Sequence, residues 1–356
     1  MQQLANLDCF YLAQEMHARL AGSFLENVYD YGEERGVFRL RFSKESVLID
    51  LKGFAFIAEK FPEAPKRPSS FAMLLRKHLS SAKLATVKQA GFDRIIEFTF
   101  STKNGSKTLI VELFGKQGNL LFLDENRKII MPFKREEYAA RKLARAETYS
   151  LPPSEKKHPL ELVESDFDGG KGKIVSFLSN QTSLAPFYLE EACMRASIGL
   201  EEKIENLSPK QKEALIGSLK TLFENPSPTA YMKDGKPIAF SSVEMDKLDK
   251  TEAKRFQTHS EAFAEYYENA EEKAPAGREG KVEFQLKSQE QALAQFDAKE
   301  AEAQAAGKWV FENTELVEEL LALAKQKNSG ALSKLAGKHG LNARIEKQVL
   351  EVEKAC

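Results

Sequence analysis

The feature that most constrains the fold of this chain is a series of short apolar runs separated by turn residues. Four such runs lie between residues 24 and 59, and five more lie between residues 84 and 133. Glycine, charged or turn residues bound each run, which is typical of β-strands. Lys103-Asn104-Gly105 predicts a hairpin turn between two of the later runs. The segment to about residue 150 is therefore predicted to be α+β, with a mainly antiparallel sheet.

One of these runs, "AGFDRIIEFTF" at residues 90–100, combines apolar residues with an Asp-Arg pair. Because side chains alternate across a strand, Arg94 is predicted to share a face with Ile96 and Phe98. A buried guanidinium without a partner is very costly, which leaves two interpretations. Either Arg94 forms a structural ion pair with a carboxylate, or it emerges at the rim of the sheet, where Gly91 would turn the chain.

Helical patterns alternate with the strands and dominate after residue 173. Asn6 is predicted to cap a helix that runs to about Leu20, and "FAMLLRKHL" at 71–79 is a second helix with cations near its end. Further helices are predicted over 173–182, 183–197, 208–225 and 260–274, the last one started by Ser260. Strands at 229–234 and 236–242 are expected to rejoin the first sheet or its partner.

The C-terminal part has the composition of a helical arm. After a linker at 274–280 the chain is rich in Gln, Glu, Ala and Lys, and Leu286, Leu293 and Phe296 have heptad-like spacing. Gln289 and Glu300 interrupt this seam, so the coiled-coil signal is weak. Two more helices are predicted, over 314–326 and 342–355.

The charge of the chain is balanced overall but uneven along the sequence. The 356 residues carry a net charge of −1, which predicts no general attraction to nucleic acid or membrane. Two basic runs nevertheless fall in the N-terminal part: Lys66, Arg67, Arg76, Lys77, Lys83, Lys88 and Arg94, and then Arg127, Lys128, Lys134, Arg135, Arg141, Lys142 and Arg145. They form either a solvated face or a surface for a polyanionic partner.

The cysteines and the N-terminus indicate a cytoplasmic protein. Cys9, Cys193 and Cys356 are isolated and odd in number, which argues for a reducing compartment and against structural zinc. Asp8 and Glu15 fall where a signal peptide needs an apolar run, and no segment is long and apolar enough to span a membrane. No metal site, cofactor or catalytic arrangement is expected among the five histidines.

An ordered series of motifs carries a family resemblance. The series begins with Asp8 and continues with "RKHL" at 76–79, "VKQAGFDRII" at 87–96, "ELFGKQGNLLFLD" at 112–124, "ETYSLPP" at 147–153, "SLAPFYLEEACMRAS" at 183–197, "TAYMKDGKPIAF" at 229–240, "SEAFAEYYENAE" at 260–271 and "AGKWVFENTELVEELLALA" at 306–324. Together these motifs resemble the NFACT ribosome quality-control family, which includes NEMF, RqcH and fibronectin-binding protein A-like proteins.

The resemblance implies a domain plan. An NFACT-N domain over 1–172, similar to the N-terminal domain of formamidopyrimidine-DNA glycosylases, is followed by a helix-hairpin-helix domain over 173–226. A returning strand pair and helix over 227–272 complete the NFACT-N domain. A coiled-coil or helical arm over 281–356 is expected to be truncated, because family members also carry the rest of the coiled coil and an NFACT-R domain.

The resemblance also implies a function. Family members bind large ribosomal subunits obstructed by peptidyl-tRNA and recruit tRNA, in bacteria chiefly alanyl-tRNA, so that the stalled chain is extended without mRNA. Peptidyl transfer belongs to the ribosome, so the chain is not expected to be an enzyme; a ubiquitin ligase is a further expected partner in eukaryotes.

The expected tRNA-binding residues are Asp8, Asp93, Arg94, Arg76, Lys77, His78 and Lys88. The family ties the positions of Asp8, Asp93 and Arg94 to tailing and tRNA engagement. Guanidinium groups hold phosphates and stack on bases, and a carboxylate accepts from base edges. Asp8 has an alternative role, because an acidic residue in the first turn also complements the helix dipole.

Two other classes of function fit the sequence less well. A nucleic-acid enzyme related to the DNA glycosylases would use an N-terminal proline amine and a zinc finger, whereas this chain has Gln2 and no zinc-binding cysteine set. An adhesin, as the older family label suggests, would need export, for which the sequence shows no signal.

Overall fold

The computed structural model describes residues 2–32, 35–63, 67–115, 117–248, 252–271, 309, 311, 313–325, 329–346 and 349–354. The chain forms two compact units, residues 1–274 and 275–356. The predicted linker at 274–280 and the seam of Leu286, Leu293 and Phe296 lie outside the described residues.

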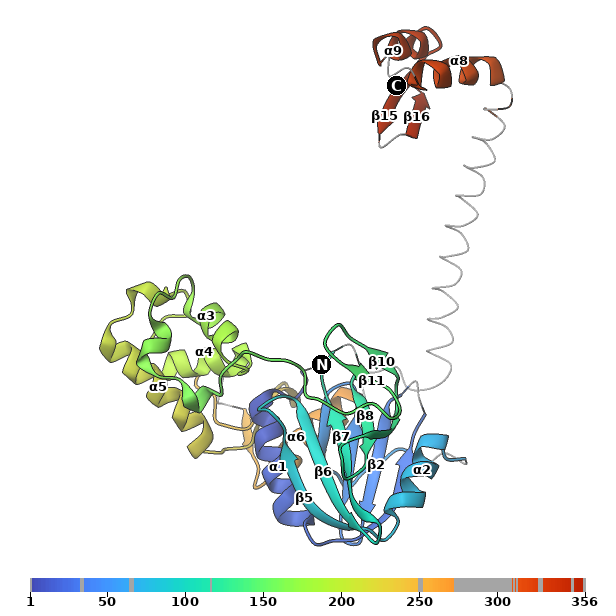
Figure 1. Ribbon diagram of the computed structural model, residues 1–356. Coiled ribbons are helices and arrows are strands. Elements are labelled where there is room, and N and C mark those ends of the chain that lie inside the picture. The colour runs from blue at the N-terminus through green and yellow to red at the C-terminus, as the bar shows by residue number, and fades with distance from the viewer. Residues whose placement is uncertain are drawn as a thin grey trace. The chain divides into compact units, whose positions relative to one another are not determined.

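Two antiparallel sheets form the centre of the first unit (Figure 1). The first has the order β1 (Leu25–Asp30), β2 (Val37–Phe42), β3 (Ser46–Asp50) and β4 (Phe54–Ile57). The second has the order β5 (Lys83–Gln89), β6 (Ile95–Thr102), β7 (Gly105–Glu112), β8 (Asn119–Leu123) and β9 (Ile129–Pro132). Both sheets contribute to one core, in which the rings of Phe42 and Phe100 stack with centroids 6.4 Å apart. These strands confirm the predicted antiparallel α+β fold.

Apolar side chains on the two faces of strand β6 enter two different cores. Ile96, Phe98 and Phe100 face the core shared with the first sheet, and Ile95 faces a second core on the other side. The second core includes Leu143 of β11 (Lys142–Leu143), which pairs with β10 (Glu136–Glu137). The hairpin between β6 and β7 turns at Lys103 and Asn104, as predicted.

Three helices pack against the sheets: α1 (Asn6–Leu20), α2 (Ser70–Leu79) and α6 (His259–Glu271). The predicted start of α1 is one residue late, because Ala5 occupies the N-cap position and its N–H donates to Asp8.

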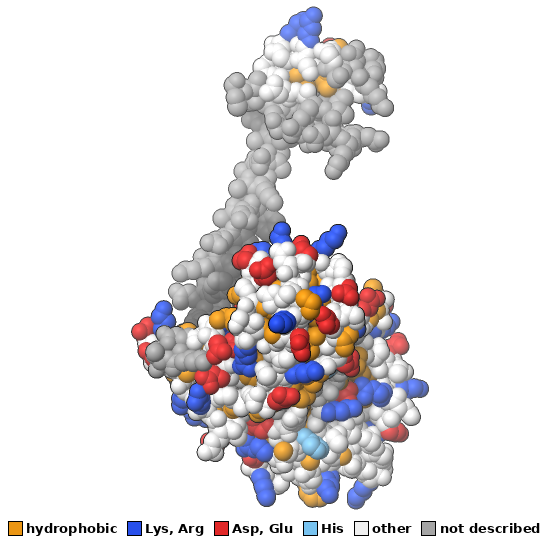
Figure 2. Space-filling view, turned by 90° about the vertical axis from the view of Figure 1, so that its left-hand side faces the viewer, with side chains coloured by type: hydrophobic (Ala, Val, Ile, Leu, Met, Phe, Trp, Pro, Cys, Tyr) orange, Lys and Arg blue, Asp and Glu red, His pale blue; other side chains and the backbone are white. Residues whose placement is uncertain are grey.

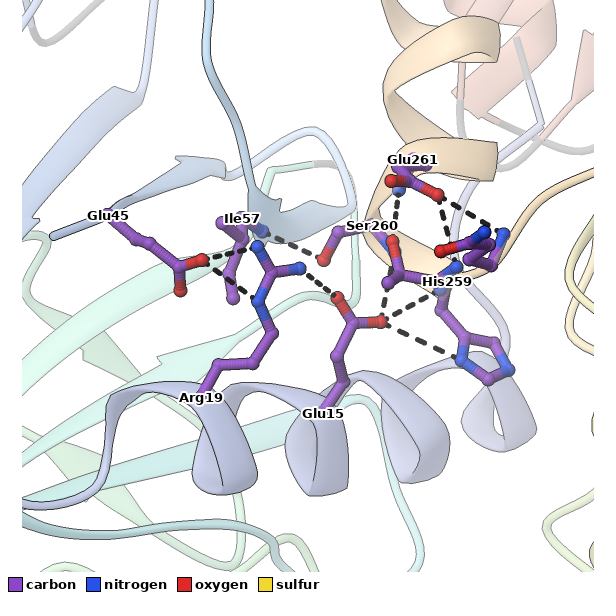
Figure 3. Close-up of polar contacts among 9 residues, drawn as sticks. Glu15, Arg19, Glu45, Ile57, His259, Ser260 and Glu261 are labelled. Atoms are coloured by element: carbon purple, nitrogen blue, oxygen red, sulfur yellow. Dashed lines mark hydrogen bonds and ion pairs between the residues drawn. The ribbon is translucent and has the colours of Figure 1, made fainter.

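The N-terminus of α6 is bonded to α1. Glu15 on α1 accepts from the backbone N–H groups of His259 and Ser260 at 2.8 and 3.1 Å (Figure 3). The helix does not start at Ser260 as predicted but at His259, and the hydroxyl of Ser260 accepts from the N–H of Ile57 at 3.1 Å. The hydroxyl of Thr258 accepts from the N–H of Glu261.

Helices α3 (Ile174–Gln181), α4 (Pro186–Arg195) and α5 (Pro209–Glu224) enclose a core of their own. Leu7 and Tyr11 of α1 and the ring of Phe92 also belong to this core, so the helical part packs on the N-terminal half of α1. Short 3-10 helices at Pro159–Glu161, Glu164–Phe167 and Ile204–Asn206 connect these elements.

The returning strands form a separate sheet, so the expectation that they rejoin the first sheet or its partner is wrong. The sheet has the order β13 (Lys236–Ser241), β12 (Thr229–Lys233) and β14 (Ala253–Arg255). Side-chain packing takes the place of strand pairing: Tyr231 enters the helical core, and Phe240 enters the core of the large sheets.

The second unit contains α8 (Thr314–Lys325), α9 (Ser329–Lys338), β15 (Leu341–Glu346) and β16 (Val349–Lys354). Leu320, Leu332 and Ala336 form its core together with Leu341. The helix predicted over 342–355 is wrong, because β15 and β16 pair as an antiparallel hairpin there. Apolar residues at 341, 343 and 345 alternate with polar ones, which is the period of a strand.

Candidate nucleic-acid interface

The Asp93-Arg94 pair lies in the turn between β5 and β6, before the strand begins. Gly91 and Phe92 have positive φ angles of 62° and 44°, so the chain turns sharply there. The predicted alternation therefore starts at Ile95, and the placement of Arg94 on the apolar face of the strand is wrong. Arg94 is half-buried at the rim of the sheet.

The contacts of Arg94 favour the rim interpretation over a structural ion pair. Its Nη1 donates to Oε1 of Gln3 at 3.0 Å, and no carboxylate of the described part of the chain forms an ion pair with it. Asp93 Oδ1 accepts from the backbone N–H of Arg94 at 2.7 Å. The side chain of Asp93 therefore bonds to the backbone of the turn and not to the guanidinium of Arg94.

Hydrogen bonds tie this turn to the N-terminus of α1. Gln89 Nε2 donates to the carbonyl oxygens of Asn6 and Asp93, both at 2.8 Å. Asn6 Nδ2 donates to the carbonyl oxygen of Phe92 at 3.1 Å. Two segments that are more than 80 residues apart are thus held side by side.

Asp8 lies behind this contact and is fully buried. Its Oδ2 accepts from the N–H of Ala5 at 2.7 Å, and its Oδ1 accepts from the hydroxyls of Tyr188 and Ser242, the latter at 2.7 Å. Burial raises the pKa of Asp8 from 3.8 to about 6, although these hydrogen bonds favour the charged form. Asp8 therefore joins α1 to α4 and to the end of β13, away from solvent.

A groove opens in front of Arg94. It has a cavity volume of about 740 Å³. Residues 2–6, Arg94, Lys156, residues 179–180 and residues 183–187 form its walls. Lys156 is exposed, and its Nζ donates to the carbonyl oxygen of Ser179 at 2.7 Å. Two cations and several amide and hydroxyl groups thus face one opening, which suits a polar, anionic ligand.

The remaining predicted residues lie elsewhere. Arg76, Lys77 and His78 occupy the last turn of α2, and α2 and α1 lie at opposite sides of the sheets (Figure 1). Arg76 Nε donates to the carbonyl oxygen of Val28 at 2.7 Å. The ring centroid of His78 lies 5.6 Å from that of Phe122, and partial burial together with the charges of Lys77 and Lys107 lowers the pKa of His78 below its usual value.

Lys88 on β5 is involved in an ion-pair cluster. Its Nζ lies 3.3 Å from Oε2 of Glu97, and Arg127 Nη2 lies 2.7 Å from Oε1 of the same carboxylate. Of the predicted residues, Arg94 lines the groove, with Asp93 beside it in the same turn. Asp8 is buried and bonded to Ala5 of the groove wall, and Lys88 and the α2 cations are not among the lining residues.

Several residues that line the groove or support it were not predicted as site residues from the sequence. Gln89 and Asn6 lie beside predicted positions and supply the bonds between the two segments. Gln3, Lys156 and Tyr188 are isolated in the sequence, so no local pattern marks them. On the face that carries α3, α4 and α5, cationic and anionic side chains are interspersed (Figure 2).

Neither a metal site nor a membrane-spanning helix is found among the described residues. They contain no group of three or more His, Cys, Asp or Glu side chains placed to hold a metal ion. None of their helices combines the length and the apolar character that crossing a bilayer requires.

Comparison with known proteins gives the following matches. A family model described as NFACT N-terminal and middle domains matches residues 7–334. The archaeal Rqc2 homolog aRqcH of Methanocaldococcus jannaschii is 31% identical over 285 residues, which are 74% of this chain and 42% of that protein. The ribosome quality control complex subunit NEMF of Homo sapiens is 31% identical over 229 residues, which are 61% of this chain and 21% of that protein. This chain thus spans less than half the length of these two relatives.

The fold also matches a solved structure. The crystal structure of the fibrinogen binding protein from Staphylococcus aureus aligns with a TM-score of 0.60 at 21% identity, covering 74% of this chain and 98% of that one. This match confirms the fold class.

Proposed function

We propose, since this chain belongs to the family of NFACT N-terminal and middle domains, that it is a ribosome quality-control factor whose groove at Arg94 binds tRNA. The observation that carries this proposal is the joining of Asp93 and Arg94 to the N-terminus of α1 at the edge of an open groove. The names of the relatives, Rqc2 homolog and ribosome quality control complex subunit, support the biological context.

The chemistry of Arg94 suits an RNA ligand. A guanidinium has five N–H donors, and within the described residues Arg94 uses one nitrogen, Nη1, on Gln3. The other donors are available for a phosphate, and the planar group can stack on an unpaired base. Asp93 adds a carboxylate, which accepts from base amino groups but repels phosphate.

Asp8 acts in this proposal as a positioning residue. It is fully buried and touches the backbone of Ala5, so it fixes the start of α1 and, through Asn6, the turn that carries Arg94. Its bond to Tyr188 also fixes α4, whose first residues form the opposite wall of the groove.

The finer steps of the proposal follow the family resemblance. The chain binds large ribosomal subunits that carry peptidyl-tRNA and recruits tRNA, with alanyl-tRNA as the expected species, for tailing of the stalled chain without mRNA. The ribosome carries out peptidyl transfer, so the chain acts as a binding factor in the cytoplasm.

The test is a filter-binding series with tRNA between 50 and 200 mM salt. Arg94→Ala is expected to weaken binding to all tRNAs at least tenfold and to reduce the salt slope by about one, because it removes one phosphate contact. Asp93→Ala is expected to reduce the preference among anticodons while leaving the slope unchanged. Both variants should melt within a few degrees of the wild type.

Lys103→Ala is the matched control. Lys103 is exposed in the hairpin turn at the far end of β6, about 30 Å from Arg94 along the strand. The Lys103→Ala variant loses one positive charge, as Arg94→Ala does, but at a position remote from the groove. It should therefore bind tRNA like the wild type. Equal losses in Lys103→Ala and Arg94→Ala, or a wild type that binds no tRNA at any salt, would refute the proposal.

A further inference from the structure

A second pocket lies beside the Arg94 groove. Its cavity volume is about 420 Å³, and its lining includes Lys52, Phe114, Gln117, Lys134, Glu136 and Tyr138. We refer to it as the Tyr138 pocket. It combines aromatic rings with lysines, which is the composition of sites that bind unpaired nucleotides.

The aromatic side of the pocket is fixed by a buried ion pair. The guanidinium of Arg141 lies 5.3 Å from the ring centroid of Tyr138 and 5.7 Å from that of Phe114. Arg141 itself is held by both oxygens of Glu112, at 2.6 and 2.9 Å, and its side chain is only 5% exposed. Arg141 is therefore occupied in positioning the rings, while Tyr138 remains 46% exposed.

The charges around the rings favour an anion. Lys52 is exposed, and Lys134 is half-buried with its Nζ 5.9 Å from the ring centroid of Phe133. The described lining has two lysines and one carboxylate, that of Glu136. Oε2 of Glu136 accepts from Nδ2 of Asn119 at 2.9 Å, and the same nitrogen donates to the carbonyl oxygen of Lys134 at 2.8 Å. Asn119 thus engages the carboxylate and fixes the backbone that carries Lys134.

One side chain connects the pocket to the groove. Gln3 Oε1 accepts from Arg94, and Gln3 Nε2 donates to the carbonyl oxygen of Lys52 at 2.6 Å. The backbone N–H of Leu113, the residue before Phe114, donates to the carbonyl oxygen of Arg94 at 2.8 Å. The two openings are therefore neighbours on one surface.

We propose that the Tyr138 pocket binds an unpaired base and the adjoining phosphate of the RNA that occupies the Arg94 groove. The base stacks on Tyr138, and Lys52 and Lys134 bind the phosphate. The inference rests on the proposed function and extends it to a second nucleotide site, which recognises a base by its flat face and is therefore tolerant of sequence.

The test measures binding of the full chain to an unmodified tRNA transcript as a function of salt. Tyr138→Ala is expected to weaken binding about tenfold without changing the salt slope, because a stacked base is lost and no charge is removed. Tyr138→Phe keeps the ring and should stay within twofold of the wild type. Lys52→Ala and Lys134→Ala should each reduce the salt slope by about one.

Phe24→Ala is the matched control. Phe24 is 52% exposed and follows the C-terminal end of α1, whereas Gln3 precedes the N-terminal end of that helix. Phe24→Ala should therefore leave tRNA binding unchanged. Wild-type affinity in Tyr138→Ala, or a loss in Tyr138→Phe as large as in Tyr138→Ala, would overturn the stacking site.

The outcome separates this inference from the proposed function. If Arg94→Ala weakens tRNA binding and Tyr138→Ala does not, the Tyr138 pocket is refuted and the Arg94 groove stands. If the wild type binds no tRNA, both are refuted together.

Discussion

Replacing Asp8 with Asn is expected to remove part of the pH dependence of the folding stability. Burial raises the pKa of Asp8 from 3.8 to about 6, and the hydrogen bonds from Tyr188, Ala5 and Ser242 offset only part of this effect. The folded chain therefore keeps a proton that the unfolded chain releases between these pH values. Stability falls as the pH rises through this range, because the folded state binds more protons there.

The magnitude follows from the size of the pKa change. One pKa unit corresponds to 1.36 kcal/mol, so complete titration of Asp8 removes about 3 kcal/mol of stability, of which about 2 kcal/mol falls between pH 4 and pH 7. Asn does not titrate, and its amide oxygen still accepts from Tyr188 and Ser242. The amide nitrogen of Asn would face the N–H of Ala5, so this hydrogen bond is lost. The loss lowers the folding stability by the same amount at every pH.

The assay is urea unfolding followed by far-UV circular dichroism at pH 4, 5, 6 and 7. Circular dichroism is preferred because the one tryptophan, Trp309, belongs to the second unit and would report on that unit. The wild type should lose about 2 kcal/mol more than Asp8→Asn between pH 4 and pH 7. If the free energies of unfolding of the two proteins change in parallel with pH, or if the wild type gains stability relative to the variant as the pH rises, Asp8 is not a buried group that titrates with a raised pKa.

Three further outcomes are expected. Burial alone would raise the pKa of Glu97, but the hydrogen bond and the charge of Arg127 outweigh it, so the pKa is lowered. The wild type should therefore lose stability in urea unfolding as the pH falls below about 4.5, which is the opposite direction to Asp8. Glu97→Gln should lack this loss, because Gln does not titrate. Gly118→Ala should cost about 3 kcal/mol in urea unfolding, because an added Cβ would lie 2.0 Å from the carbonyl oxygen of Glu112. Borohydride should trap no adduct with duplex DNA that contains 8-oxoguanine, because residue 2 is not proline and the backbone nitrogen of Gln2 donates to the hydroxyl of Tyr266 at 2.7 Å; a trapped adduct would revive the glycosylase alternative.

The strands were predictable from the sequence because their signals are local. Alternating apolar residues and the turn at Lys103-Asn104-Gly105 indicate β6 and β7 without knowledge of their partners. Arg94 was placed wrongly because the positive φ of Phe92 moves the start of the strand, and Phe92 is a residue type that rarely adopts this conformation. Gly91 was the only local sign of the turn.

The buried environment of Asp8 was beyond local sequence reasoning. Tyr188 lies 180 residues along the chain from Asp8, and Ser242 lies 234 residues from it. Nothing in the spacing of either residue indicates that the helical part packs on α1 and closes over the carboxylate. The family resemblance implies a role for Asp8, and its burial and hydrogen bonds support the proposed positioning role.

The most direct test of the proposal that the Arg94 groove binds tRNA is site-specific photocrosslinking in cells. A photoreactive amino acid is placed at Gln3, which is exposed and contacts Arg94, or at Lys103 as the control. The crosslinked RNA is then sequenced. The account predicts that Gln3 yields tRNA well above the Lys103 background and that Arg94→Ala reduces this yield. Equal tRNA yields from both positions, or crosslinks from Gln3 that contain no tRNA, would contradict it.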